Sequence, residues 1–196
     1  TKRHPKISKP WHPPGLFRNR LRAVFLRLEF EMPLPLPIAP QVALAKIIDP
    51  ALEQLPRAMD SDRAALLLLV IGLQESGFLR RKQLGQGPAR GLWQFERGGC
   101  DAVMGNALCK PFLPAIFAQH AVPRSAANLY LALAGDDILA CKIARLLLWS
   151  DRAALPAIGD QEAAWAYYVR NWRPGEPRPK DWDANYQLAM HTLGID

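Results

Sequence analysis

The sequence has no long hydrophobic run. Its longest uncharged apolar stretch, Ala64 to Leu73, is much shorter than the roughly 20 residues that a membrane-spanning helix needs. The basic N-terminus is interrupted by Arg20, Arg22 and Arg27, so it lacks the continuous apolar centre of a secretory signal. We therefore expect neither a transmembrane segment nor a signal peptide.

Cysteine is scarce, and no metal-binding pattern is present. Cys100, Cys109 and Cys141 form no C-x-x-C pair, so the sequence predicts no zinc or thiol-redox motif. The four histidines are scattered without metal-ligand spacing, and we expect no cofactor and no metal. Cys100 and Cys109 are close enough in the sequence for a loop disulfide, but we favour free thiols, as in a protein made in the cytoplasm.

Positive charge is concentrated at one end of the chain. Residues 1–31 hold eight of the 25 Lys and Arg residues but only two of the 18 Asp and Glu residues. The rest of the chain is therefore close to neutral. A nucleic-acid-binding domain carries its basic patch on the folded unit, so we do not expect nucleic acid as a partner.

Residues 1–40 are expected to form an arm and linker, and residues 41–196 a folded domain. The arm is rich in proline, which removes backbone donors and disfavours a compact helical fold. Residues 17–28 fit a short amphipathic basic helix, with a strand over residues 26–30 as the alternative. The proline-rich residues 33–37 are expected to form an extended linker. The prolines of the arm are at positions 5, 10, 13, 14, 33, 35, 37 and 40.

From Gln41 onward the apolar spacing is helical, with a break expected at Pro50. A long helix should begin near Ser61, which is a capping candidate, and should end at Glu75. Because strand signals are scarce, we expect a mostly α fold. Further helices are expected at roughly 97–108, 112–120, 125–134, 136–150, 160–171 and 183–193.

Glu75 is the candidate for acid chemistry. At the C-terminal end of a buried apolar helix, desolvation and the negative end of the helix dipole both disfavour its anion. A carboxyl group that keeps its proton near neutral pH can protonate a poor leaving oxygen, as cutting a glycosidic bond requires. A solvated glutamate at a helix end is the ordinary alternative.

A glycine-rich segment follows this helix. Four glycines interrupt residues 77–91, so we expect a loop or a small hairpin there. Gly87 and Gly91 allow left-handed torsions or the close approach of a sugar to the backbone. Trp93 and Gln94 offer a stacking face and an amide for N-acetyl groups. An ordinary tight turn into a strand is the alternative.

Two segments here resemble a known family. Gln74-Glu-Ser-Gly-Phe78 and Gly91-Leu-Trp-Gln-Phe95 are similar to the Glu-Ser and Gly-Leu-Met-Gln segments of lytic transglycosylases and goose-type lysozymes. The resemblance implies a lysozyme-like α-helical domain with a small loop or hairpin lobe, in which the second segment lines a glycan groove. It implies that Glu75 is the catalytic acid and base, supported by Ser76. The residues implied to contact substrate are Ser76, Gly91, Leu92, Trp93 and Gln94.

A third segment, between Trp165 and Gly175, resembles the late helix of the same family, where a tyrosine faces the catalytic glutamate. Tyr168 is the first choice for this role and Tyr167 the second, because adjacent helical residues point about 100° apart and only one can face the groove. No asparagine directly follows the tyrosine, so the match is loose. Trp165 and Trp172 fit core positions equally well.

Two departures from the family bear on the reaction. Trp93 stands where the family has methionine, and no second carboxylate has an evident nucleophile position. An inverting hydrolase needs a carboxylate about 6.5–9.5 Å from the acid to position water, whereas in a transglycosylase the 6-hydroxyl of the substrate attacks. We favour the transglycosylase. The other acidic residues considered, which we expect to be solvated, are Glu96, Asp101, Asp136, Asp137 and Asp181.

The resemblance thus implies a glycosidase that cuts the MurNAc–GlcNAc β-1,4 bond of bacterial peptidoglycan strands. A compact lysozyme-like domain behind a cationic arm is similar to phage endolysins and wall-cutting virion proteins, which are made in the host cytoplasm and act in the periplasm or cell wall. Residues 1–40 would bind an anionic outer-membrane surface, dock onto other virion proteins, or stay a solvated tail. The alternative function is a peptidoglycan-binding or virion structural protein that kept the fold without turnover.

Overall fold

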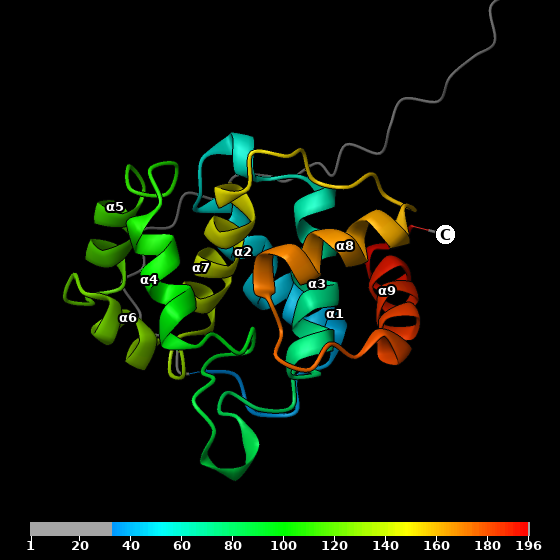
Figure 1. Cartoon of the computed structure of the whole chain (residues 1–196), viewed down its shortest axis with the longest axis horizontal. Coiled ribbons are helices and arrows are strands. Elements are labelled where there is room, and N and C mark those ends of the chain that lie inside the picture. The colour runs from blue at the N-terminus through cyan, green and yellow to red at the C-terminus, as the bar shows by residue number, and fades with distance from the viewer. Residues whose placement is uncertain (1–32, 196) are drawn as a thin grey trace, which may run out of the picture. The chain divides into compact units, whose positions relative to one another are not determined.

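The computed structural model describes residues 33–195, and helices make up most of them (Figure 1). Within this range there is no strand, and the β-type pairing consists of isolated bridges of Arg90 with Lys82 and Phe95. The expected mostly α fold is therefore confirmed. The α-helices are α1 (Pro40–Ala43), α2 (Asp49–Glu53), α3 (Asp62–Glu75), α4 (Arg97–Gly105), α5 (Leu113–Gln119), α6 (Ala126–Ala132), α7 (Asp137–Ser150), α8 (Gln161–Trp172) and α9 (Pro179–Leu193).

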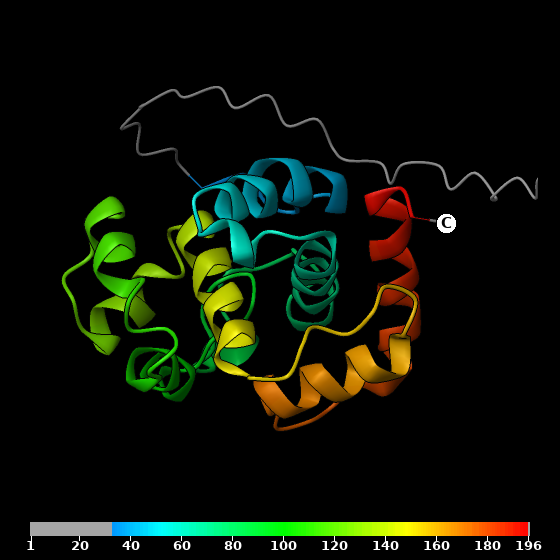
Figure 2. The same ribbon diagram turned by 90° about the horizontal axis from the view of Figure 1, so that it is seen from above.

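Helix α3 is the central element of the fold. Ser61 caps its start, because its side-chain oxygen accepts a hydrogen bond from the backbone N–H of Ala64 at 3.2 Å. Every residue from Ala64 to Gly72 is buried, as expected for a helix surrounded by other helices. Figure 2 shows α3 nearly end-on with α7, α8 and α9 around it. The predicted helix from Ser61 to Glu75 is confirmed, and it carries Glu75 out of the core.

The helical segment at 40–53 continues through Pro50, where the sequence predicted a break. Leu44–Ile48 forms a π-helical turn, in which the N–H of Asp49 bonds to the carbonyl of Leu44. A proline has no N–H to donate, and in an α-helix its ring clashes with the carbonyl four residues earlier. The wider turn accommodates the ring, so α1 and α2 form one continuous helical stretch.

Residues 33–39 belong to the folded domain, which corrects the domain boundary expected at residue 40. The Arg81 side chain donates a hydrogen bond to the carbonyl of Leu34 at 2.7 Å, and the N–H of Ile38 donates to the carbonyl of Phe78 at 3.0 Å. The Ile38 side chain is part of the hydrophobic core. The linker predicted at 33–37 is thus fixed to the domain. The helix predicted at 17–28 and the alternative strand at 26–30 lie outside the described residues.

The three cysteines are buried free thiols, as the favoured alternative predicted. Burial raises the pKa of Cys100 to about 12 and that of Cys109 to about 11, so both stay protonated at neutral pH. Between residues 33 and 195, no helix combines the length and apolar character needed to cross a membrane. The same residues contain no group of three or more His, Cys, Asp and Glu side chains placed to hold a metal ion.

Candidate active site

A tight turn at residues 90–95 lies beside the end of α3. The backbone N–H of Arg90 bonds to the carbonyl of Phe95 at 2.9 Å, and the reverse bond measures 2.8 Å. Gly91 has a φ of 75°, one of the left-handed torsions that the sequence allows at this glycine. Gly87 has a φ of −60°, so it does not use that freedom. Gly91 therefore supplies the torsion on which the turn depends.

Gly91 also has no room for a side chain. A Cβ at this position would lie 2.9 Å from the backbone carbonyl oxygen of Leu133. Because both the torsion and this contact oppose a larger residue, we expect Gly91→Ala to lower the free energy of unfolding by about 2–5 kcal/mol in a urea titration. Gly85→Ala is the matched control, since Gly85 is also left-handed but a Cβ there would meet no atom within 4 Å. Gly85→Ala should lower the free energy of unfolding by only about 1 kcal/mol. Equal losses in the two variants would show that the contact with Leu133 does not matter.

Ser76 and Leu92 connect α3 to this turn. Ser76 is 1% exposed, and its hydroxyl donates to the carbonyl of Leu92 at 2.7 Å while accepting from the N–H of Phe78 at 3.1 Å. The Leu92 side chain is fully buried. Neither side chain lines the groove described below, and neither does Gly91. The structure therefore places these three residues as supports for the site and not as substrate contacts.

Trp93 is buried, which contradicts the stacking face predicted for it. Its side chain is 0% exposed, its Nε1 donates to the carbonyl of Leu68 at 2.8 Å, and its ring packs edge-on against Phe78 with centroids 6.1 Å apart. The sequence alone does not distinguish an enclosed indole from an exposed one, because tryptophan occurs in both environments. Here Trp93 anchors the turn to the middle of α3.

Gln94, the next residue, lines a groove of about 1140 Å³. Its side-chain nitrogen donates to the carbonyl of Gly91 at 2.8 Å, which orients the amide. The groove also has aromatic surface, supplied by the half-buried Trp172. Trp172 donates through Nε1 to the carbonyl of Trp93 at 3.1 Å and packs on Phe95 with ring centroids 5.7 Å apart. An aromatic face is thus present in the groove, but it comes from Trp172.

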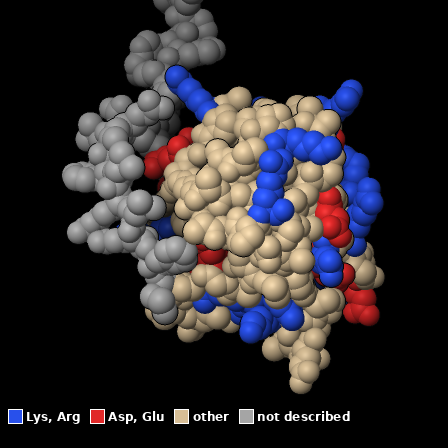
Figure 3. All heavy atoms as spheres, turned by 90° about the vertical axis from the view of Figure 1, so that its left-hand side faces the viewer, with Lys and Arg blue, Asp and Glu red and all other residues tan. Residues whose placement is uncertain are grey.

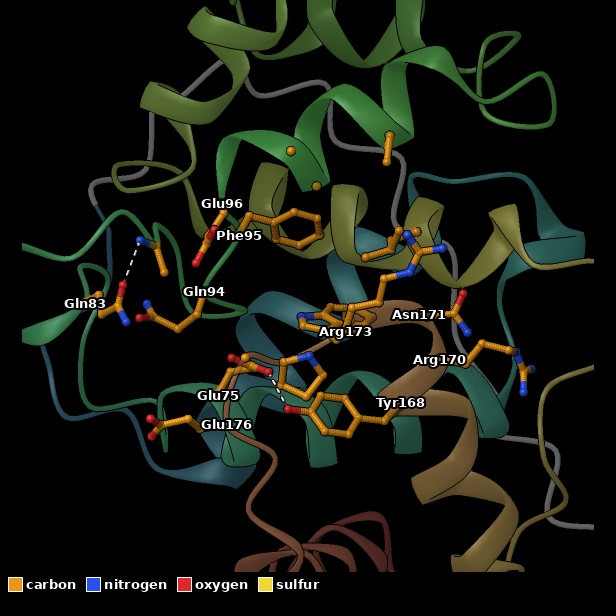
Figure 4. Close-up of a pocket in the computed structure, with 18 of the residues that line it drawn as sticks. Glu75, Gln83, Gln94, Phe95, Glu96, Tyr168, Arg170, Asn171, Arg173 and Glu176 are labelled. Atoms are coloured by element: carbon orange, nitrogen blue, oxygen red, sulfur yellow. Dashed lines mark hydrogen bonds between the residues drawn. The ribbon is translucent and has the colours of Figure 1, made fainter.

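The carboxyl group of Glu75 lies in the same groove, at the end of α3 (Figure 4). The Tyr168 hydroxyl donates a hydrogen bond to its Oε1 at 2.7 Å. Burial raises the pKa of Glu75 above its ordinary value. The Tyr168 hydrogen bond and the positive charges of Arg178 and Arg80 offset this effect only in part. The groove therefore holds a carboxyl group that keeps its proton to higher pH than a solvated glutamate does.

Of the two adjacent tyrosines of α8, Tyr168 faces Glu75 and Tyr167 faces the core. The Tyr167 hydroxyl donates to the carbonyl of Leu148 at 2.8 Å, and the guanidinium of Arg170 lies 4.8 Å from the centre of its ring. Tyr167 does not line the groove. Tyr168 thus faces Glu75, as the first choice from the sequence predicted. The prediction that Tyr167 contacts substrate is corrected, because Tyr167 lies outside the groove.

Removing the Tyr168 hydroxyl should raise the pKa of Glu75 further. The hydrogen bond to Oε1 stabilises the carboxylate form, so its loss in Tyr168→Phe favours the protonated form. A titration of the Glu75 carboxyl carbon by NMR measures the change. Tyr167→Phe is the matched control, because it removes a buried hydroxyl one residue away that does not contact Glu75. A lowered or unaltered pKa in Tyr168→Phe would contradict the assigned role of the hydrogen bond.

The raised pKa of Glu75 also links stability to pH. Because the folded protein binds this proton more tightly than the unfolded chain, the contribution of Glu75 is fully present below the unfolded pKa and is lost as pH rises through the folded pKa. Glu75→Gln removes this titration. We therefore expect the stability of the variant relative to wild type to increase as pH rises from about 4 to 7. Thermal unfolding across this range tests it, and parallel curves for the two proteins would refute it.

Gln74 fixes the loop after α8 against the site, a role that the sequence does not predict. It is 1% exposed. Its Nε2 donates to the carbonyl of Arg178 at 2.9 Å, and its Oε1 accepts from Nδ2 of Asn185 at 2.9 Å. Arg178 in turn donates to the backbone carbonyl of Gln74. These bonds hold the loop beside Glu75, and the only sequence signal for them was the position of Gln74 inside the Gln-Glu-Ser segment.

No protein-family model matches this sequence, and neither a curated protein nor a solved structure does.

Proposed function

We propose that this chain is a lysozyme-like glycosidase of the lytic transglycosylase type, cutting the MurNAc–GlcNAc β-1,4 bond of peptidoglycan. The observation that carries the proposal is the Glu75 carboxyl group, which lies in a groove with its pKa raised by burial and one oxygen held by Tyr168. The groove volume of about 1140 Å³ also exceeds the roughly 300–1,000 Å³ usual for small-molecule sites, as a site for a polymer should.

In the proposed reaction, protonated Glu75 donates its proton to the bridging oxygen, and the bond from that oxygen to C1 of MurNAc breaks. Positive charge then develops at C1, next to the newly formed Glu75 carboxylate. The 6-hydroxyl of the same MurNAc attacks C1 and gives its proton to Glu75. The products are a 1,6-anhydro sugar and a shortened strand, and no water is consumed. Tyr168 holds the Glu75 carboxylate in place through both proton transfers.

A second carboxylate placed to activate water in the groove would distinguish a hydrolase from a transglycosylase. Hydrolysis with inversion needs a second carboxylate to activate water. Asp151 lines the groove, but Arg170 binds its Oδ2 at 2.7 Å and Asn171 donates to the same oxygen. Glu96 and Glu176 also line the groove. Neither has a partner that would fix it for water activation among the described residues, so the transglycosylase is the better supported reaction.

The test is digestion of purified peptidoglycan by the full chain. A glycosidase should release soluble muropeptides without forming new free amino groups, because it cuts no peptide bond. Soluble fragments accompanied by new amines would indicate a peptidase or amidase. No release would favour the alternative of a binding or structural protein that lacks turnover.

A nucleic-acid function is not supported. Figure 3 shows Lys and Arg side chains spread over the α5–α6 end of the molecule with Asp and Glu among them, and no basic patch on that face. The folded residues thus lack, on this face, the concentrated positive charge that binds a phosphate backbone. A phage source, action in the periplasm or cell wall, and docking through residues 1–40 belong to the proposal as expectations from the family resemblance.

A further inference from the structure

Arg173 ends helix α8 in a conformation that favours glycine. Its φ and ψ are 49° and 53°, the left-handed region that a residue with a side chain adopts at an energetic cost. The backbone N–H of Arg173 still closes the helix by donating to the carbonyl of Val169 at 3.0 Å. Glycine would close the helix equally well without strain. Strain of this kind gathers at functional sites, so the contacts of the Arg173 side chain decide whether it has a use there.

Among residues 33–195, the Arg173 side chain has no hydrogen-bond or ion-pair partner, unlike the other three arginines that line the groove. Arg170 is ion-paired with Asp151 at 2.7 Å. Arg178 donates to the carbonyl of Gln74, and Arg80 donates to the carbonyl of Glu75 at 3.3 Å. Arg173 is exposed and makes no side-chain hydrogen bond or ion pair with residues 33–195. Its guanidinium group is thus available to a ligand.

The position of Arg173 separates it from the free carboxylates of the groove. Figure 4 shows Glu96 and Glu176 on the Gln83 side of the pocket, whereas Arg173 extends into the pocket on the side of Asn171. A guanidinium group offers a planar pair of donors that matches a carboxylate. An acidic group bound beside Arg173 would lie away from Glu96 and Glu176, which would repel it. The Asp151 carboxylate is held by Asn171 on this side, but its charge is already paired with Arg170 at 2.7 Å.

We propose that Arg173 binds a carboxylate carried by the glycan strand, so that the groove favours acidic strands over neutral ones. This inference rests on the proposed function and specifies its substrate. In peptidoglycan the carboxylate has two sources. One is the peptide attached to the lactyl group of MurNAc, and the other is the lactyl group itself where the peptide has been removed.

Binding to the full chain carrying Glu75→Gln, which slows turnover enough to measure binding, tests the proposal. Three tetrasaccharide probes are compared by calorimetry: one with peptides, one without peptides but with free lactyl groups, and neutral chitotetraose. Adding Arg173→Gln should weaken binding of an acidic probe about tenfold while changing chitotetraose binding much less. Arg173→Lys should restore part of the loss. Arg124→Gln, an exposed arginine outside the groove, is the matched control and should change neither.

The probe that loses affinity identifies the source of the carboxylate. Equal losses for all three probes, or none for the acidic ones, would overturn the inference. Arg173→Gly separates this role from a structural one, because relief of the left-handed strain should keep or raise the melting temperature while affinity falls. A lowered melting temperature with unaltered affinity would also overturn it. Cleavage of peptidoglycan by the wild type is scored separately, so failure of the proposed function is distinguished from failure of this inference.

Discussion

Glu75→Gln should lower the rate of muropeptide release from peptidoglycan by about 100- to 10,000-fold, the usual contribution of a general acid. Glutamine keeps the size of the side chain and an oxygen to accept the Tyr168 hydrogen bond, but it has no proton to give to the leaving oxygen. The fold should survive, because the substitution removes a buried ionisable group and no packing. Initial rates with equal amounts of folded protein, checked by circular dichroism, measure the effect.

Glu96→Gln and Glu176→Gln are the matched controls for this loss. Both residues line the same groove as Glu75, so the three variants make the same chemical change within one site. If the substrate's own 6-hydroxyl is the nucleophile, neither carboxylate takes part in a proton transfer. The rate of muropeptide release should then fall less than about tenfold in each control. A loss in either control as large as that in Glu75→Gln would instead identify a water-activating base and make the enzyme a hydrolase.

Asp137→Ala should lower the free energy of unfolding by about 3–5 kcal/mol, because it leaves the Arg81 guanidinium buried without its partner. Arg81 and Asp137 are 12% and 6% exposed, and two hydrogen bonds of 2.7 and 2.5 Å join them. Arg81 also holds Leu34 through its side chain and Gly91 through its backbone carbonyl. The pair thus fixes the start of the domain and the turn of the site to the first residue of α7. Urea unfolding measures the loss.

Two further variants show whether burial is the cause. Asp181→Ala breaks the ion pair with Arg178, in which both side chains are about half exposed. The free energy of unfolding should therefore fall by less than about 1 kcal/mol. The double variant Arg81→Met with Asp137→Leu replaces both charges by apolar side chains and should regain most of the stability lost in Asp137→Ala. A small loss in Asp137→Ala would show that water solvates Arg81 in the folded protein.

Most of the helices could be predicted because each begins or ends with a local signal. The long helix begins at the Ser61 cap and ends where Ser76 and Gly77 follow. Where a helix boundary differs from the predicted one, the cause is local as well. Helix α4 ends at Gly105 because the Asn106 side chain accepts from the N–H of Leu108 at 2.8 Å and forms a turn. Helix α9 begins early, because Pro179 occupies the first helical position, where a proline needs no N–H.

The candidate site was less predictable, because burial of a side chain depends on contacts distant in sequence. The position of Glu75 follows from the helix that carries it, and the choice of Tyr168 over Tyr167 follows from the family resemblance and helical geometry. Trp93 is buried because its indole N–H bonds to the carbonyl of Leu68, which is distant in the sequence. Arg173 gave no signal, since only the backbone torsion shows that it occupies a position suited to glycine.

Mass spectrometry of the muropeptides that wild type and Glu75→Gln release from purified peptidoglycan distinguishes the transglycosylase from the hydrolase reaction and tests the role of Glu75. We expect 1,6-anhydro-MurNAc products from the wild type and their loss in the variant. Reducing-end MurNAc from the wild type would contradict the transglycosylase reaction. The same anhydro products from Glu75→Gln at an undiminished rate would contradict the assignment of Glu75 as the acid.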